Sequence, residues 1–200
     1  MKHLEARKCV QTHLLASAEV KQRVANACLD DIIAAAEMIV ETMQAGGKIM
    51  LCGNGGSAAD SQHIAAEFTN RLSTALERPA LAALALTTDT SFLTANANDY
   101  GFEHVFERQV EALGKKGDVL VGISTSGNSQ NVIRAVRLCR QRGIRTIGLL
   151  GGDGGQLRVL VDLAIVVPSN NTQYIQEAHI AIGHIMCELV EKSLFNDERE

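Results

Sequence analysis

Two short segments of the sequence combine glycines with small polar residues that could bind an anion. The first is GNGGS (53–57) and the second is STSGNS (124–129). Glycine lets the backbone approach a ligand closely, and a helix that starts after such a loop presents free N–H groups that suit a phosphate. The alternative is two tight turns with serine N-caps, but the second segment has more hydroxyl groups than capping requires.

A histidine and a glutamate lie four residues apart just after the first segment. His63 and Glu67 share one face if this part of the chain is helical, so both could reach one metal ion or one substrate. Such pairs are also common on solvated helices. The last predicted helix adds Gln176, His179 and His184. Gln176 can converge on one point with either histidine, so the spacing alone does not choose between them.

A further polar pair, Asn98 and Asp99, precedes a predicted helix that starts near Phe102. An aspartate directly before a helix commonly accepts a hydrogen bond from the first turn. The sequence therefore slightly favours Asp99 as an N-cap over a part in a site.

Predicted strands and helices alternate along the chain, and they must position these residues. Apolar residues that recur every three or four positions predict two helices from about His3 to Gln44, which Gly46 and Gly47 end. Apolar runs predict strands at 48–53, 82–86, 117–124, 145–151 and 162–167. Helices are predicted at 57–70, 102–113, 129–142 and 173–195, with a partly helical segment at 87–98, a short helix after the glycine-rich turn 151–155, and a frayed tail at 196–200.

Nearly continuous apolar strands that alternate with helices are typical of a parallel sheet covered on both faces. We expect an α/β fold with a five-stranded, doubly wound parallel sheet in a three-layer sandwich, and a single domain over residues 1–200. In such sheets, ligands bind beyond the carboxyl ends of the strands. The helices within 1–45 fall outside the alternating pattern and are expected to contact a partner subunit, leaving 46–195 as the α/β core.

Composition and motifs exclude several functional classes. With 19 Lys and Arg against 23 Asp and Glu, the chain has a net charge of −4. It therefore lacks the excess of basic residues that is typical of a nucleic-acid-binding protein. Neither glycine-containing segment is a Walker A or a dinucleotide-binding motif. No apolar run predicts a membrane helix or a signal peptide. The five scattered cysteines are interpreted as reduced core thiols of a cytoplasmic protein.

Four segments together resemble the bacterial phosphoheptose isomerases of the SIS domain superfamily. They are GNGGSAADSQHIAAEF, LTTDTSFLTANANDYGFE, GDVLVGISTSGNSQN and IQEAHIAIGHIMCELVE, and the resemblance runs from about Leu14 to Phe195. It implies a flavodoxin-like SIS fold, a homotetramer, and isomerisation of sedoheptulose 7-phosphate to D-glycero-D-manno-heptose 7-phosphate. This reaction is the first step towards ADP-heptose for lipopolysaccharide or other surface glycans. The resemblance also implies one zinc ion per subunit, at an active site between subunits.

The resemblance implies a role for individual positions. It selects His184 over His179, and the implied metal ligands are His63, Glu67, Gln176 and His184. The implied contacts to the sugar phosphate are Asn54, Gly55, Gly56, Glu67, Asn98, Asp99, Ser124, Thr125, Ser126, Ser129 and Gln176. The chain departs from the family pattern at Asn128 and in NNTQY (170–174), which leaves loop detail open.

An aldose–ketose isomerase needs a base, an acid and a group that stabilises a developing oxyanion. The resemblance suggests Glu67 as the base and His184 as the acid. One alternative is a non-catalytic SIS protein that binds phosphosugars or regulates replication initiation; the replication regulator lacks counterparts of these two residues. Another is an arabinose 5-phosphate isomerase, which usually carries a further C-terminal module.

Overall fold

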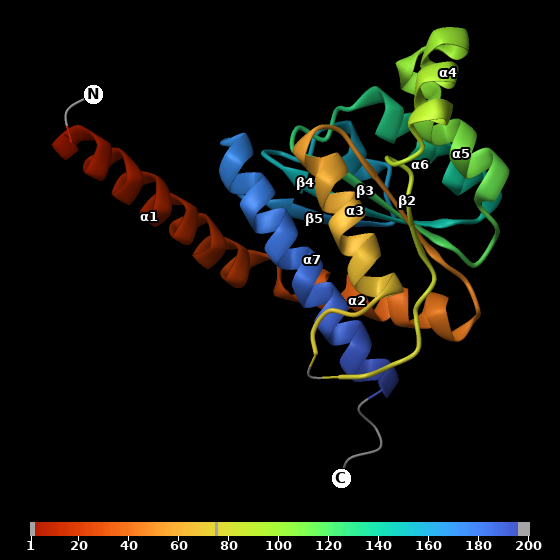
Figure 1. Ribbon diagram of the computed structural model, residues 1–200, viewed down its shortest axis with the longest axis horizontal. Helices are drawn as coiled ribbons and strands as arrows, with labels where there is room; N and C mark the ends of the chain where they lie inside the picture. The colour runs from red at the N-terminus through yellow and green to blue at the C-terminus, as the bar shows by residue number, and fades with distance from the viewer. Residues whose placement is uncertain (1–2, 75, 196–200) are drawn as a thin grey trace.

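Five parallel strands form the centre of the structure, a computed structural model that describes residues 3–74 and 76–195 (Figure 1). The strands follow the order β2-β1-β3-β4-β5, which is the order of flavodoxin-like sheets. Their bounds are Ile49–Gly53 (β1), Ala83–Ala85 (β2), Val119–Ser124 (β3), Arg145–Gly151 (β4) and Leu163–Val167 (β5). The predicted five-stranded parallel sheet is confirmed.

Successive residues of the strands point into two separate cores. In β1, Ile49 and Leu51 belong to one buried cluster and Met50 belongs to the other. All three side chains are completely buried. This explains why the strands are almost wholly apolar, because each face of a sheet between two helix layers must be apolar.

Helices cover both faces of the sheet and complete a three-layer sandwich. One layer consists of α2 (Leu29–Gln44), α3 (Gly56–Thr69) and α7 (Thr172–Phe195), which contribute to the same core cluster. On the other face lie α4 (Thr90–Tyr100), α5 (Val105–Leu113) and α6 (Gln130–Arg142). Short 3₁₀ turns, η1 (Phe102–His104) and η2 (Gln156–Val159), complete the set. No helix in the described ranges is both long and apolar enough to cross a membrane.

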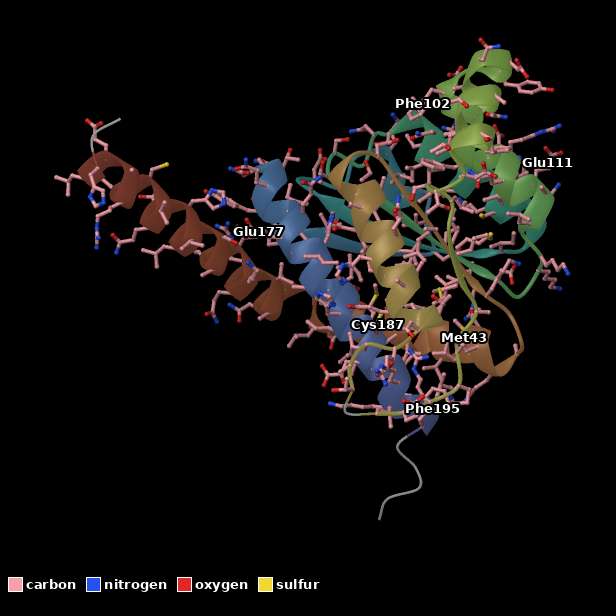
Figure 2. The ribbon with its side chains drawn as sticks, viewed as in Figure 1. Met43, Phe102, Glu111, Glu177, Cys187 and Phe195 are labelled. Atoms are coloured by element: carbon pink, nitrogen blue, oxygen red, sulfur yellow. The ribbon has the colours of Figure 1, made fainter. Side chains whose placement is uncertain are left out.

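The first helix, α1 (His3–Ala27), extends away from the sheet (Figure 1). Only its last part is buried, through Ser17, Val20 and Val24. Glu177 of α7 holds this part by contacts with His13, Ser17 and Lys21 (Figure 2). The outer part leaves apolar side chains in solvent, namely Leu4, Val10, Leu14 and Leu15.

Two expectations need correction. Asp99 is not an N-cap: it lies in the last turn of α4, whose own N-cap is Asp89, and Gly101 with φ 96° separates α4 from η1. The cysteines are free, but Cys9 is exposed because it lies on the projecting part of α1, whereas the other four are buried. The predicted tail at 196–200 lies outside the described residues.

Candidate active site

The two glycine-containing loops lie next to each other at the carboxyl edge of the sheet. Their strands, β1 and β3, are neighbours, with Gly53 paired to Ile123. Asn54 of the first loop exchanges two side-chain amide hydrogen bonds, of 3.0 and 2.8 Å, with Asn131 in the first turn of α6, which follows the second loop. The loops 53–57 and 124–129 thus form one cradle, towards which the N-termini of α3 and α6 are directed. Such an arrangement favours an anion.

The cradle serines do not cap the two helices through their side chains. Gly55, with φ 57°, is the N-cap of α3, and Ser129 occupies the N-cap position of α6 but makes no side-chain capping hydrogen bond. Ser129 Oγ instead lies 2.9 Å from Ser124 Oγ. This argues against the alternative of two serine-capped turns. Beside the cradle is a cleft of ≈ 370 Å³, lined by Thr125, Ser126, Gly151, Gly152, Asp153, Asn170, Thr172 and Ile175.

Replacement of Gly127 by Ala is expected to destabilise the protein by more than about 2 kcal/mol. Gly127 has φ 64°, and an added Cβ would lie 1.9 Å from the carbonyl oxygen of Gly154. Urea unfolding would measure the change. The matched control is Gly117→Ala, where φ is 95° but no atom lies within 4 Å of the added Cβ. An equal loss in both variants would show that the contact with Gly154 contributes nothing.

Three potential metal ligands converge between α3 and α7. Glu67 Oε1 lies 3.1 Å from His63 Nε2 and 2.7 Å from His184 Nδ1. The ligand atoms of these three residues all lie within 4.8 Å of one another. The Glu67 side chain is 11% exposed, whereas the histidines are 54% and 43% exposed. The cluster is therefore anchored on a buried carboxylate and opens to solvent through the two imidazoles.

The donor set of this cluster fits a zinc ion. Imidazole nitrogens and a carboxylate oxygen are common zinc ligands. In addition, Glu67 Oε2 is buried and has no hydrogen-bond partner among the described residues. A buried carboxylate oxygen without a partner is unfavourable, and a bound cation would remove this penalty.

Asp60 also faces the cluster, although the sequence had not identified it. It precedes His63 by one turn of α3. Burial raises the pKa of Asp60, while His63 and His184 act in the opposite direction. Its Oδ2 is buried without a hydrogen-bond partner in the described part of the chain. The spacing of three and then four residues along Asp60, His63 and Glu67 could have revealed this shared face.

The structure does not gather every predicted site residue at the cluster. Gln176 lies at the cradle, because a Cβ added to Gly56 would lie 2.7 Å from its Nε2. Its place as a metal ligand stays a prediction. Asn98 and Asp99 are exposed on α4, whose apolar residues pack on the opposite side of the sheet from α3 and α7. Within one chain, this pair thus belongs to the helix layer opposite to the one that carries the cluster.

The surroundings of His179 fit a residue that stabilises the fold and do not fit a metal ligand. It is completely buried, and its Nε2 donates a hydrogen bond of 2.9 Å to the carbonyl of Leu150. Burial lowers its pKa to about 4, although the hydrogen bond to Leu150 opposes this. The neutral imidazole is thus the form that the fold accommodates.

The protein is expected to lose stability on acidification through His179. Because the pKa of His179 is lower in the folded state, the unfolded chain binds more protons between pH 6.5 and 4. The stabilisation is complete above the unfolded pKa and falls as the pH drops towards 4, by up to about 3 kcal/mol. Urea unfolding across this range would show the slope, and His179→Gln should reduce it. An equal slope in the variant would assign the effect to other groups.

Comparison with known proteins relates this geometry to a family. The SIS domain family matches residues 13–151. The phosphoheptose isomerase of Chlorobaculum tepidum is 54% identical over 94% of this chain and 90% of its own length. Among solved structures, the phosphoheptose isomerase of Neisseria gonorrhoeae has 47% identity and a TM-score of 0.88, covering 94% of this chain and 99% of its own. That of Francisella tularensis has 37% identity and a TM-score of 0.89, covering 96% and 100%.

These likenesses extend over the cradle, the α3–α7 pair and nearly all of the sheet. The protein therefore belongs to the phosphoheptose isomerase family of SIS-domain proteins.

Proposed function

We propose that this protein is an aldose–ketose isomerase that converts sedoheptulose 7-phosphate to D-glycero-D-manno-heptose 7-phosphate. The observation that carries the proposal is the buried carboxylate of Glu67, which both His63 and His184 contact. It lies on the same helix whose N-terminus forms part of the cradle. The same helix thus carries the candidate base for an enediol reaction and contributes to the candidate phosphate-binding site. The names of the similar proteins support the same reaction.

The reaction moves a proton between adjacent carbons of the open-chain sugar. Glu67 would remove the proton from C1 of the ketose and return it to C2, through an enediol. His184 would exchange protons with the sugar oxygens. The cradle, with the hydroxyl groups of Ser124, Thr125, Ser126 and Ser129, would hold the phosphate and so limit the motion of the reacting carbons.

His63, Glu67 and His184 would hold one zinc ion, with Gln176 as the proposed fourth ligand. A zinc ion there would supply Lewis-acid polarisation of the sugar carbonyl. Glu67 would be oriented by the two histidines, which contact the same oxygen. The buried position of Glu67 limits its contact with water, which suits a base that must act on carbon.

We further propose a homotetramer in which neighbouring subunits complete the site. The uncovered apolar side chains on the projecting part of α1 suit a contact with a second copy. A neighbouring subunit would also explain how Asn98 and Asp99 could reach a sugar, because within one chain they belong to the helix layer opposite to the cluster. A cytoplasmic location and a place at the start of ADP-heptose synthesis are consistent with a phosphorylated sugar substrate.

The decisive test is incubation of the purified protein with sedoheptulose 7-phosphate in D₂O, followed by NMR. The proposal requires aldose product and incorporation of deuterium at C2. Arabinose 5-phosphate, tested in parallel, should be converted much more slowly. Tight binding of sedoheptulose 7-phosphate without turnover would instead support a non-catalytic phosphosugar-binding protein.

A further inference from the structure

A buried arginine lies beside the last turn of α3. Arg78 belongs to the loop that joins α3 to β2, yet its side chain is completely buried. A buried guanidinium group is unfavourable unless acceptors and a negative charge surround it. The groups that surround Arg78 therefore indicate what its burial achieves.

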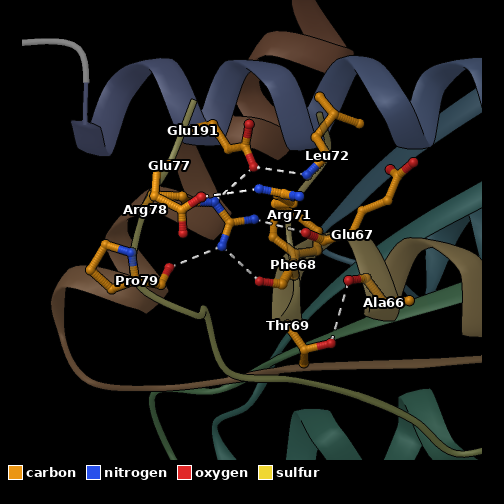
Figure 3. A network of polar contacts seen from close by, with 10 residues as sticks. All are labelled: Ala66, Glu67, Phe68, Thr69, Arg71, Leu72, Glu77, Arg78, Pro79 and Glu191. Atoms are coloured by element: carbon orange, nitrogen blue, oxygen red, sulfur yellow. Dashed lines mark hydrogen bonds and ion pairs between the residues drawn. The ribbon is translucent and has the colours of Figure 1, made fainter. Parts of the chain in front are cut away.

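Arg78 binds the end of α3 and a carboxylate of α7 at the same time (Figure 3). Its Nη2 donates to the carbonyl of Glu67 at 2.7 Å, and its Nη1 donates to the carbonyl of Phe68 at 2.9 Å. Its Nε donates to Glu191 Oε1 at 2.7 Å, and this oxygen also accepts a hydrogen bond from the N–H of Leu72. The last carbonyls of a helix lack intrahelical partners, so Arg78 caps α3 from a distant position.

The helices that Arg78 connects are also the helices that carry the cluster. They approach closely, because a Cβ added to Gly183 of α7 would lie 2.6 Å from Ile64 Cδ1 of α3. Glu191 follows His184 by seven residues, or about two turns, and so lies on the same face of α7. Glu67 is held at both of its ends: its carboxylate contacts His63 and His184, and its carbonyl accepts from Arg78.

We propose that Arg78 is a positioning residue for the active site, acting through Glu67 and through its ion pair with Glu191. Any displacement of α3 along α7 would break hydrogen bonds of the planar guanidinium group, so Arg78 fixes the register at which Glu67 Oε1 meets both histidines. The inference rests on the proposed role of Glu67. Lysine would keep the charge but not the fork of donors.

Two variants and one control test this role. Arg78→Lys keeps the positive charge opposite Glu191 and loses the simultaneous contacts. The double variant R78M/E191L removes both charges, and replacement of a buried ion pair by apolar residues is often neutral for stability. The control is Asp118→Asn, because Asp118 is a buried carboxylate that pairs with Lys48 at the start of β1 and β3, away from the cluster.

The first readout is the set of histidine ring signals in NMR spectra of the metal-free protein. The signals of His63 and His184 are expected to shift in R78K and in R78M/E191L, and to stay unchanged in D118N. The second readout is the zinc affinity, measured by competition with a chromophoric chelator. Zinc binding is expected to weaken by about 10- to 100-fold in both Arg78 variants, which is typical when an outer-shell partner is lost, and to stay unchanged in D118N.

Unchanged histidine signals and zinc affinity in both Arg78 variants would overturn the proposal and leave the ion pair with a purely structural role. A change in R78K without one in R78M/E191L would also overturn it, because both variants lack the guanidinium contacts and the effect would then come from the introduced lysine. If the wild-type protein binds no zinc or fails to isomerise the sugar, the proposed function fails. The histidine signals of the metal-free protein still decide the role of Arg78 in that case.

Discussion

Replacement of Glu67 by Gln is expected to lower kcat for sedoheptulose 7-phosphate by about 10²- to 10⁴-fold, the usual contribution of a positioned general base. Glutamine has nearly the same shape, so the contacts of α3 with α7 are retained, but the amide cannot accept the proton from carbon. Exchange of the C1 proton with solvent, followed by NMR, measures the step directly.

The control for Glu67→Gln is Glu188→Gln on α7. Glu188 is exposed and pairs with Lys192 on the same helix, so the loss of its charge should leave the exchange rate unchanged. Exchange at the wild-type rate in Glu67→Gln would contradict the assignment of the base. Asp60, which lies on the same face of α3, would then be the next residue to test.

Replacement of His184 by Ala is expected to remove most bound zinc and most activity. The affinity should fall by more than the roughly 10- to 100-fold that the loss of an outer-shell partner costs, because a direct ligand is removed. His184 is 43% exposed, so the variant should fold normally. Metal analysis of the purified protein, with thermal unfolding of the metal-free form, provides the measurement.

His179→Ala, on the same helix, is expected to affect stability and not metal binding. It should retain its metal but lose stability, by a few kcal/mol, because it leaves a cavity and an unpaired carbonyl at Leu150. Full metal content in His184→Ala would show that His184 is not a ligand. Loss of metal in His179→Ala, without unfolding, would contradict the structural role of that residue.

The sequence predicted the elements well because the periodicity of the apolar residues follows directly from the two cores. The apolar runs around Met50 and Leu120 are buried on both faces, and this pattern is typical of parallel strands. The prediction for Asp99 was wrong because α4 continues to Tyr100, and Gly101 rather than a polar side chain marks the boundary. Local capping preferences could not show how far α4 extends.

The candidate site was predictable only where its residues are close in sequence. His63 and Glu67 share a face by spacing alone. The distinction between His179 and His184 depends on which side of α7 meets the sheet, and residue spacing left that choice open. Arg78 and Glu191 lie 113 residues apart, and no pattern in the sequence indicated that they meet.

The cradle and the cluster share one rigid element, α3, which contributes residues to both, and this has a consequence for the size of the substrate. From Gly56 to His63, whose imidazole contacts the Glu67 carboxylate, the helix rises by about 10 Å. Under the proposed function, a sugar anchored by its phosphate must span this length for its first carbons to reach Glu67. The helix then acts as a ruler: a five-carbon sugar phosphate held by the same loops would end two carbons short. Discrimination by chain length would thus depend on the pitch of the backbone more than on the recognition of individual hydroxyl groups.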